Sequence, residues 1–432
     1  MKKRVIALAL AAAMALGMTA CGAKSEGGSA SADATGSVYW LNFKPEADEA
    51  LQEIAKTYES ETGVPVKVVT AASGTYESTL TSEMDKSGAP TLFVVGNAAA
   101  VDTWKDYCID LTGTDIANEL NTDAYNLYDD AGRLVSIGYC YEAYGIITNK
   151  ALLKEAGYDI ADIKDFDSLK AVADDIHARS AELGFDAFTS SGMDDSSSWR
   201  FTGHLANMPL YYEAVEDGWT ECPAEIKGTY LDYFKNVWDL YTTDTATDKG
   251  TLATGGYDAA AEFGEGKAVF YQNGTWEWSN LTGTFGMNPD DLAMIPIYCG
   301  AEGEENASLC CGTENCWAVN SKASEADQKA TLDFMKWMVT SEAGTKMMAQ
   351  ELGAIPYKSA VAPENAFLAD ATKYAEEGKY VVTWAFNYTP NVNEWRAGLV
   401  AAMNQYDAGG DWGTVETAFV QGWATQYKAA NE

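Results

Sequence analysis

Two tryptophans stand two residues apart in the middle of the chain, and polar side chains flank them. Residues 268–278 read AVFYQNGTWEW, an apolar run typical of a buried strand, a polar turn containing Asn273, and then Trp276 and Trp278. An indole plane suits the C–H face of a pyranose ring, and Asn and Glu side chains suit its hydroxyl groups. Because ligand sites of open α/β sheets form at strand ends, this segment predicts a sugar-binding surface. Burial of both indoles in a core is the alternative.

A second candidate is an acid inside an apolar and aromatic strand. Residues 137–150 read IGYCYEAYGIITNK, and Glu142 lies there between Tyr141 and Tyr144. An ionised carboxylate is costly to bury without a partner. Glu142 therefore either faces a wet cleft, where it accepts hydrogen bonds from sugar hydroxyls, or forms a salt bridge. We expect the cleft, because the neighbouring tyrosines suit a carbohydrate-binding wall.

Alternating strand and helix patterns position these residues. Apolar runs at 37–41, 65–70 and 91–95 predict strands, with a helix between each pair. The first of these helices ends at Gly63 and shares one apolar face among Leu51, Ile54, Ala55 and Tyr58. Strand, helix, strand, helix, strand is the pattern of a parallel α/β sheet. The roughly four hundred residues that follow the first 36 are enough for two lobes rather than one core.

The N-terminal residues predict export. Lys2, Lys3 and Arg4 precede an apolar run that ends at Leu16, and small residues follow, which is typical of a secretory signal peptide at 1–20. The sequence TACG at 19–22 resembles the bacterial lipobox, so we expect cleavage before Cys21 and attachment of lipid to its thiol. A plain secretory leader with an incidental cysteine is the alternative. Residues 21–36 then supply the lipidated cysteine and a flexible tether rich in small residues.

Composition narrows the ligand class. The formal net charge of −35 disfavours nucleic acid and anionic lipid headgroups as partners. Thirteen tryptophans and 24 tyrosines against two histidines suit recognition of a neutral polyhydroxylated ligand better than histidine-based catalysis or metal binding. We expect no cofactor. Seven cysteines besides Cys21 cannot all pair internally, fit no zinc pattern well, and indicate free thiols or a single disulfide.

Several of these stretches resemble one family. The segment GKAVFYQNGTWEWSN at 266–280 is similar to a GKAAM…NGPWAW segment of the carbohydrate-binding proteins of ABC importers, the maltose-binding-protein-like solute-binding protein family 1. Residues 40–69 resemble the N-terminal lobe of that family, 137–150 its first hinge strand, and 308–320 the strand that returns to the first lobe. Residues 330–344, ATLDFMKWMVTSEAG, resemble its third crossover.

The resemblance implies a fold and its boundaries. We expect two α/β lobes of the type II periplasmic-binding-protein kind, each a mostly parallel sheet flanked by helices. The N-terminal lobe would comprise residues 37–145 and 312–340, and the C-terminal lobe 146–311 and 341–432. Three crossings, near residues 145, 311 and 340, would hinge the lobes.

The resemblance also implies ligand-binding residues. It places the sugar-stacking ring on Trp276, with Trp278 as its neighbour, and adds Trp384 and Trp199 as further aromatic candidates. The loops after the first and third strands would face the sugar, although turn formation or helix capping also explains polar residues there. With Tyr144 and Asn273 on the cleft wall, the remaining candidates are Glu142, Asn42, Lys44, Ser73, Tyr76 and Asn97.

The resulting hypothesis is a binding protein rather than an enzyme. A monomeric lipoprotein on the extracellular face of the cytoplasmic membrane would capture a sugar or oligosaccharide between its lobes. It would then deliver that ligand to a membrane permease driven by a separate ATPase, because this chain contains no phosphate-binding G-x-x-x-x-G-K-[ST] motif. The alternatives are a surface glycosidase with paired carboxylates and a receptor for peptides or amino acids.

Overall fold

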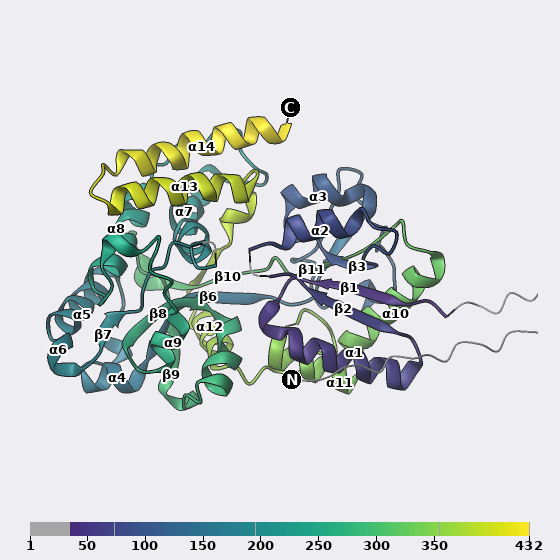
Figure 1. Cartoon of the computed structure of the whole chain (residues 1–432), viewed down its shortest axis with the longest axis horizontal. Coiled ribbons are helices and arrows are strands. Elements are labelled where there is room, and N and C mark those ends of the chain that lie inside the picture. The colour runs from purple at the N-terminus through teal and green to yellow at the C-terminus, as the bar shows by residue number, and fades with distance from the viewer. Residues whose placement is uncertain (1–34, 73, 195, 354, 432) are drawn as a thin grey trace, which may run out of the picture. The chain divides into compact units, whose positions relative to one another are not determined.

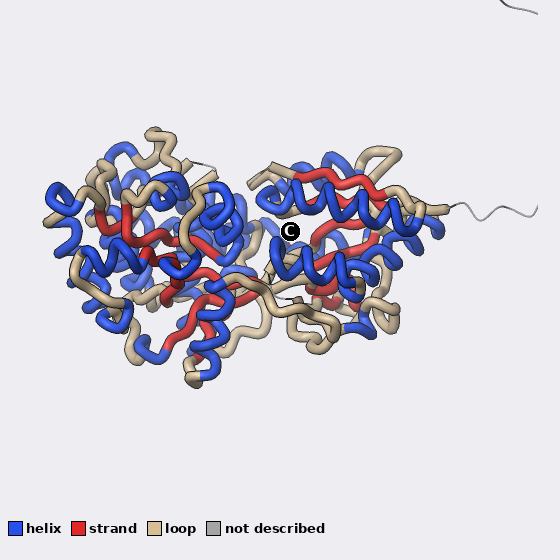
Figure 2. The backbone as a smooth tube through the Cα atoms, turned by 90° about the horizontal axis from the view of Figure 1, so that it is seen from below, coloured by secondary structure: helices blue, strands red, loops and turns tan. Residues whose placement is uncertain are grey.

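Two sheets organise the chain, and each carries its own helices (Figure 1). The structure is a computed structural model that describes residues 35–431 except 73, 195 and 354. Helices and loops surround the strands of each sheet (Figure 2). This mixed α/β architecture confirms the predicted fold class.

The first sheet has the strand order β2-β1-β3-β11-β5-β4. Its strands are β1 (Val38–Asn42), β2 (Val66–Thr70), β3 (Leu92–Val94), β4 (Leu127–Tyr128), β5 (Leu134–Gly138) and β11 (Cys316–Val319). β1 pairs in parallel with β2 and β3, whereas β11 runs antiparallel to β3 and β5. Its helices are α1 (Asp48–Thr62), α2 (Tyr76–Met84), α3 (Ala98–Trp104), α10 (Glu325–Thr340) and α11 (Glu342–Met347). In Figure 1, α2 and α3 lie above these strands and α1 and α11 below them.

The second sheet has the order β12-β10-β6-β8-β7, and β9 also pairs with β6. Its strands are β6 (Glu142–Asn149), β7 (Asp186–Phe188), β8 (Ala268–Gly274), β9 (Leu292–Ile295), β10 (Ala307–Gly312) and β12 (Tyr380–Thr383). Its helices are α4 (Lys150–Glu155), α5 (Phe166–Ala178), α6 (Ser180–Leu183), α7 (Asn207–Asp217), α8 (Leu231–Thr243), α9 (Ala259–Gly264), α12 (Ala366–Glu376), α13 (Val392–Asp407) and α14 (Gly413–Asn431).

Two short segments connect the sheets side by side. Residues 139–141 link β5 to β6, and residues 313–315 link β10 to β11. The backbone N–H of Tyr139 donates to the carbonyl of Asn315 at 2.8 Å, and the Thr313 hydroxyl donates to the carbonyl of Cys140 at 2.6 Å. The two links therefore brace each other where the chain passes between the sheets.

The third passage between the sheets comes later in the chain than residue 340. After α11, a π-helical turn η11 (Met348–Leu352) follows, and Met348, Leu352, Ile355 and Tyr357 lie in the core of the first sheet. The chain joins the second sheet only with α12, which places Phe367 in a core cluster with Leu292 and Leu309. Residues 342–352, 355 and 357 therefore pack with the first sheet, although the predicted boundary assigned them to the second lobe.

The local sequence patterns predicted the first helix correctly and one turn wrongly. The predicted apolar face of the first helix is buried in α1, and Gly63 ends this helix in a left-handed conformation with φ 73°. The predicted turn at Asn273 is wrong, because β8 continues to Gly274, which pairs with Tyr144 of β6. Among the described residues, no helix is both long and apolar enough to cross a bilayer.

Candidate functional site

A row of six rings lies at the ends of β10, β6 and β8. We call it the aromatic row; its members are Trp199, Trp276, His204, Tyr144, Trp384 and Phe386. The first three form a triangle at one end, because Trp199 also lies 4.9 Å from His204. Ring centroids are 5.9 Å apart for Trp199–Trp276, 5.5 Å for Trp276–His204, 3.9 Å for His204–Tyr144, 5.4 Å for Tyr144–Trp384 and 5.6 Å for Trp384–Phe386. Strand pairing brings these segments together, because Tyr144 is opposite Gly274 of β8 on one side and Cys310 of β10 on the other.

The ends of the row are more exposed than its middle. Trp199, Trp276 and Phe386 are half-buried, whereas His204, Tyr144 and Trp384 are buried. Burial, and then the positive charge of Arg200, lower the pKa of His204, so its imidazole is neutral near pH 7. The His204 ring stacked on Tyr144 therefore adds no charge to the row.

The Trp276 ring is held in place by close contact with Gly274, which has no side chain, and by one hydrogen bond. A Cβ atom at Gly274 would lie 2.2 Å from the indole ring, so the ring lies directly on the backbone there. Its Nε1 donates to Oδ1 of Asn273 at 2.9 Å, and the Asn273 amide donates to Glu277 at 3.0 Å. Asn273 is thus an orienting residue for the indole, and its own hydrogen bonds are made within the protein.

Trp384 is built in the same way but is buried. Its ring lies on Gly312, where an added Cβ would approach it to 2.5 Å, and its Nε1 donates to the carbonyl of Cys310 at 3.1 Å. Only 8% of the side chain is exposed, so Trp384 offers little surface for stacking on a ligand. The half-buried Phe386 stacks on it and presents the accessible ring at this end of the row.

The other two predicted tryptophans lie apart from each other. Trp199 belongs to the row; it precedes the π-helical turn η5 (Arg200–Leu205), and its Nε1 donates to the carbonyl of Ser196 at 2.7 Å. Trp278 does not belong to it. Its indole packs edge-on against Phe367 at 5.1 Å, among residues of a separate core cluster.

Three of the predicted ligand-binding residues, Asn42, Lys44 and Glu142, form contacts among themselves. The Nζ of Lys44 lies 2.6 Å from Glu142 and 2.9 Å from Glu46, and Glu142 also accepts from the amide of Asn315 at 2.7 Å. Asn42 accepts from the backbone N–H of Lys44 at 3.0 Å and donates to its carbonyl at 2.6 Å. Glu142 therefore forms the salt bridge that was the alternative, and the expected position in an open cleft is wrong.

The charges of this network fit its burial. Burial raises the pKa of Glu142, and the Lys44 ammonium and the Asn315 amide oppose that rise. For Lys44, burial favours the neutral amine, but the carboxylates of Glu142 and Glu46 raise the pKa above its usual range. The pair links the loop after β1 to the first residue of β6, so it fastens one sheet to the other.

Two further predicted residues, Tyr76 and Asn97, form hydrogen bonds within the protein. The Tyr76 hydroxyl accepts from the backbone N–H of Val94 at 2.7 Å and is buried. Asn97 caps α3, accepting from the N–H of Ala100 at 2.9 Å. The Asn97 contact is the capping role that the sequence left as the alternative, whereas the Tyr76 contact joins α2 to β3. Ser73 and Cys21 lie outside the described residues.

A carboxylate and a guanidinium complete the site. Glu314 lies on the link between β10 and β11, and Arg396 lies on α13; both are partly exposed. Burial raises the pKa of Glu314 to about 7, while the positive charge of Arg396 opposes the rise and the negative charge of Glu77 adds to it. The charge of Glu314 also contributes, after burial and Cys310, to the raised pKa of Tyr144.

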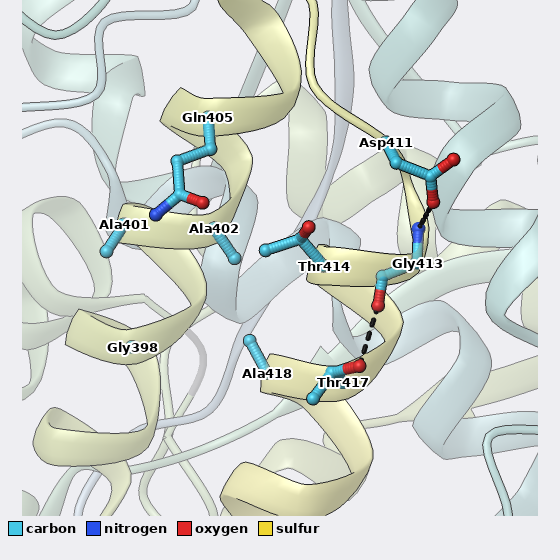
Figure 3. A pocket seen from close by; sticks show the side chains of 9 residues that line it. All are labelled: Gly398, Ala401, Ala402, Gln405, Asp411, Gly413, Thr414, Thr417 and Ala418. Atoms are coloured by element: carbon cyan, nitrogen blue, oxygen red, sulfur yellow. Dashed lines mark hydrogen bonds between the residues drawn. The ribbon is translucent and has the colours of Figure 1, made fainter.

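A separate surface groove of about 530 Å³ runs between α13 and α14 (Figure 3). Its polar groups bond to each other: Asp411 accepts from the N–H of Gly413 at 2.7 Å, and the Thr417 hydroxyl donates to the carbonyl of Gly413 at 2.8 Å. The groove shares no residue with the aromatic row, and it is lined by Gly398, Ala401, Ala402, Gln405, Asp411, Gly413, Thr414, Thr417 and Ala418.

The geometry matches a known class of protein. Residues 53–377 match the family model of bacterial extracellular solute-binding proteins, and the chain belongs to that family. Its structure is similar to that of RafE in complex with raffinose, with a TM-score of 0.71, 19% identity, and coverage of 92% of this chain and 100% of the other. It is also similar to maltose-bound MalE3 of T. maritima, with a TM-score of 0.66, 18% identity, and coverage of 91% and 99%. A chitin oligosaccharide binding protein matches with a TM-score of 0.67, 16% identity, and coverage of 91% and 99%.

Sequence reasoning missed half of the site. His204 is one of two histidines, and Phe386 is two residues beyond a tryptophan that was singled out; neither stands in a recognisable motif. Glu314 had a usable signal, because it is an acid between two apolar strands, as Glu142 is. Arg396 follows Trp395, and that tryptophan is buried with its Nε1 bonded to the carbonyl of Phe419.

Proposed function

We propose that this protein binds a neutral sugar or oligosaccharide along the aromatic row and delivers it to the permease of an ABC importer. The observation that carries this proposal is the fixed, half-buried indole of Trp276, which has one face on Gly274 and its N–H held by Asn273. A ring already held in place loses little conformational freedom when a pyranose stacks on it. The printed ligands of the similar structures, raffinose, maltose and chitin oligosaccharide, support the same class of ligand.

The proposal includes movement of the two sheets. A sugar stacked on the second sheet's aromatic row would gain further contacts from the first sheet only when the halves close on it. Ligand binding would therefore stabilise a closed form. The links at 139–141 and 313–315 are the segments about which this closure would take place.

The site of action is also part of the proposal. A leader at 1–20 and a lipid on Cys21 would hold the protein at the outer face of the cytoplasmic membrane. Replacing Cys21→Ala and fractionating the cells tests this: the variant should move from the membrane fraction to the medium. An unchanged membrane fraction would contradict the lipid anchor.

Titration calorimetry with raffinose, maltose and chitin oligosaccharides tests the binding proposal. We expect saturable heat from at least one of these sugars and no release of reducing ends. Trp276→Ala should weaken that binding by about tenfold or more, which corresponds to the loss of one to two kcal/mol of stacking and buried area (roughly 1.4 kcal/mol per factor of ten).

Trp337→Ala is the matched control. Trp337 is also half-buried and also donates its Nε1 to a neighbour, Glu61 at 3.1 Å, but it lies on α10 outside the aromatic row. This variant should bind sugar like the parent. Equal binding by Trp276→Ala and the parent would refute the assigned role of that ring, and hydrolysis of the sugar would refute the binding-protein class.

A further inference from the structure

We propose that the guanidinium of Arg200 is the positioning group that sets the spacing and tilt of the Trp199 and Trp276 rings. The centroids of these two half-buried indoles are 5.9 Å apart and their planes meet at 49°. Only 4% of Arg200 is exposed, so it would act on a bound sugar through the rings and not by direct contact. This inference rests on the proposed carbohydrate function, because it concerns the affinity of the aromatic row.

The π-helical turn η5 places two rings of the row together. Its backbone hydrogen bond from the N–H of Ala206 to the carbonyl of Phe201, at 3.0 Å, joins residues five apart, and Trp199 and His204 have the same separation. Five residues of a regular α-helix, at about 100° per residue, would rotate a side chain by about 140° onto another face. Here the Trp199 and His204 ring centroids lie 4.9 Å apart. Since π-helical turns are rare, contacts from neighbouring elements must stabilise this one.

Arg200, the first residue of this turn, contacts two other segments of the second sheet. Its Nη1 donates to the carbonyl of Gln272 on β8 at 3.1 Å, and its Nη2 donates to the carbonyl of Ser190, just after β7, at 3.3 Å. Its guanidinium carbon also lies 4.8 Å from the ring centroid of Phe201 and 5.3 Å from that of Tyr271, within cation–π range. Two carbonyls and two rings therefore hold the guanidinium.

Gln272 is the residue through which this anchoring reaches Trp276. Its carbonyl accepts from Arg200, and its Nε2 lies 2.8 Å from Nδ1 of His204, so η5 is bonded to Gln272 at two points. The next residue, Asn273, accepts the hydrogen bond from Nε1 of Trp276 at 2.9 Å. Two adjacent residues of β8 therefore hold η5 and the Trp276 indole in a fixed relation to each other.

A buried guanidinium is a costly group for this place in the fold. The described residues place Arg133 and Arg179 in ion pairs with aspartates, but they give Arg200 no ion pair. An apolar residue of similar volume would avoid the cost of desolvating the charge, yet it could not bond to either carbonyl. The planar guanidinium fixes the directions of both bonds, so its contribution is a defined position of the turn.

Titration calorimetry on Arg200→Met and Arg200→Lys tests the positioning role. The ligand is whichever of raffinose, maltose and chitin oligosaccharide binds the parent protein most tightly. Arg200→Met removes the charge and all the donors, and it should weaken binding about tenfold, as expected when one stacking ring is displaced. The ammonium of Arg200→Lys keeps the charge but lacks the forked donors, so its affinity should lie between those of the parent and Arg200→Met.

A double-mutant cycle with Trp199→Ala separates positioning from a general loss of stability. If Arg200 acts through the Trp199 ring, Arg200→Met should weaken binding clearly less in the Trp199→Ala background than in the parent. Near-ultraviolet circular dichroism gives a second readout that needs no ligand, because two indoles this close couple their electronic transitions. The part of the spectrum that Trp199→Ala and Trp276→Ala each remove, the coupled signal, should also decrease in Arg200→Met.

Arg179→Met is the matched control. The Arg179 guanidinium also donates to a backbone carbonyl, that of Ala156 at 2.7 Å, and it lies at the end of α5. This variant should keep both the affinity and the coupled signal of the parent.

The outcomes distinguish the positioning role from the carbohydrate proposal. Parent-like binding by Arg200→Met, an unchanged coupled signal, or equal losses in the two backgrounds of the cycle would each overturn the positioning role and leave the carbohydrate proposal standing. A parent protein that binds none of these sugars would overturn the carbohydrate proposal, and the coupled signal would then decide the role of Arg200. If Arg200→Met fails to fold, Arg200→Lys replaces it in the cycle and in the spectra.

Discussion

The buried ion pair between Lys44 and Glu142 makes a prediction that separates a structural role from a ligand-binding role. Replacing Lys44→Met leaves the Glu142 carboxylate buried with only the Asn315 amide as a partner. Removing one member of a buried pair costs about 3–5 kcal/mol, because the other charge stays in a low-dielectric environment. We therefore expect Lys44→Met to lower the free energy of unfolding by about that amount.

The reverse replacement should cost less. In Glu142→Gln, the Lys44 ammonium keeps its second ion pair, 2.9 Å from the partly exposed Glu46. We expect a loss of about 1–3 kcal/mol, the range for one hydrogen bond to a charged group. Equilibrium unfolding in urea, followed by fluorescence and circular dichroism together, measures both losses and shows whether the transition is two-state.

The pH dependence gives a second check. In Lys44→Met, Glu142 keeps its burial but loses the opposite charge, so its folded-state pKa lies well above the unfolded value of 4.5. The folded variant then binds a proton more tightly than the unfolded chain, and its stability falls as pH rises from 4.5 through that raised pKa. The deficit relative to the parent should thus be small near pH 4.5 and complete near pH 8. Unchanged stability of Lys44→Met with loss of sugar binding would refute the structural role.

Three further outcomes follow from the site. Burial raises the pKa of Glu314 to about 7, so the folded state favours its protonated form. Glu314→Gln should accordingly increase stability at pH 8 by at most about 3 kcal/mol and change little at pH 4.5, as urea unfolding at the two pH values would show; no difference between these pH values would contradict the raised pKa. Gly274→Ala should displace the Trp276 ring and weaken sugar binding in calorimetry while the melting temperature changes little; unaltered affinity would show that the close approach does not set the ring position. Trp384→Ala should cost about 3–5 kcal/mol of unfolding free energy because its ring is buried, and a loss below 1 kcal/mol would argue against its packing role.

Local sequence determined much of the fold. The apolar face of α1 and its end at Gly63 follow from helical periodicity and from the left-handed conformation that glycine tolerates. At α5, Asp165 and Asp167 both stand near the start of the helix, and Asp165 caps it by accepting from the N–H of Ser168 at 2.9 Å. Two acids near the start of one helix have the same capping chemistry, and backbone geometry decides which of them caps the helix.

The site was harder to predict because the role of a polar residue depends on the groups that it contacts in the folded protein. Asn42 and Lys44 have the residue types of a sugar-binding loop, and only the fold shows that Glu142 contacts Lys44 from 98 positions away in the chain. Trp276 was identifiable because Asn, Gly and Trp occur together in one local segment. Phe386 and Arg396 enter the site through packing between distant elements, which no local pattern encodes.

The link at 313–315 has a mechanical consequence. It is continuous with β10 in one sheet and with β11 in the other, and it carries Glu314 between them. A rotation of one sheet relative to the other would therefore bend the backbone of these three residues, and their stiffness would set the resistance to that movement. Substitutions at Thr313 or Asn315 should retune affinity without touching the captured molecule.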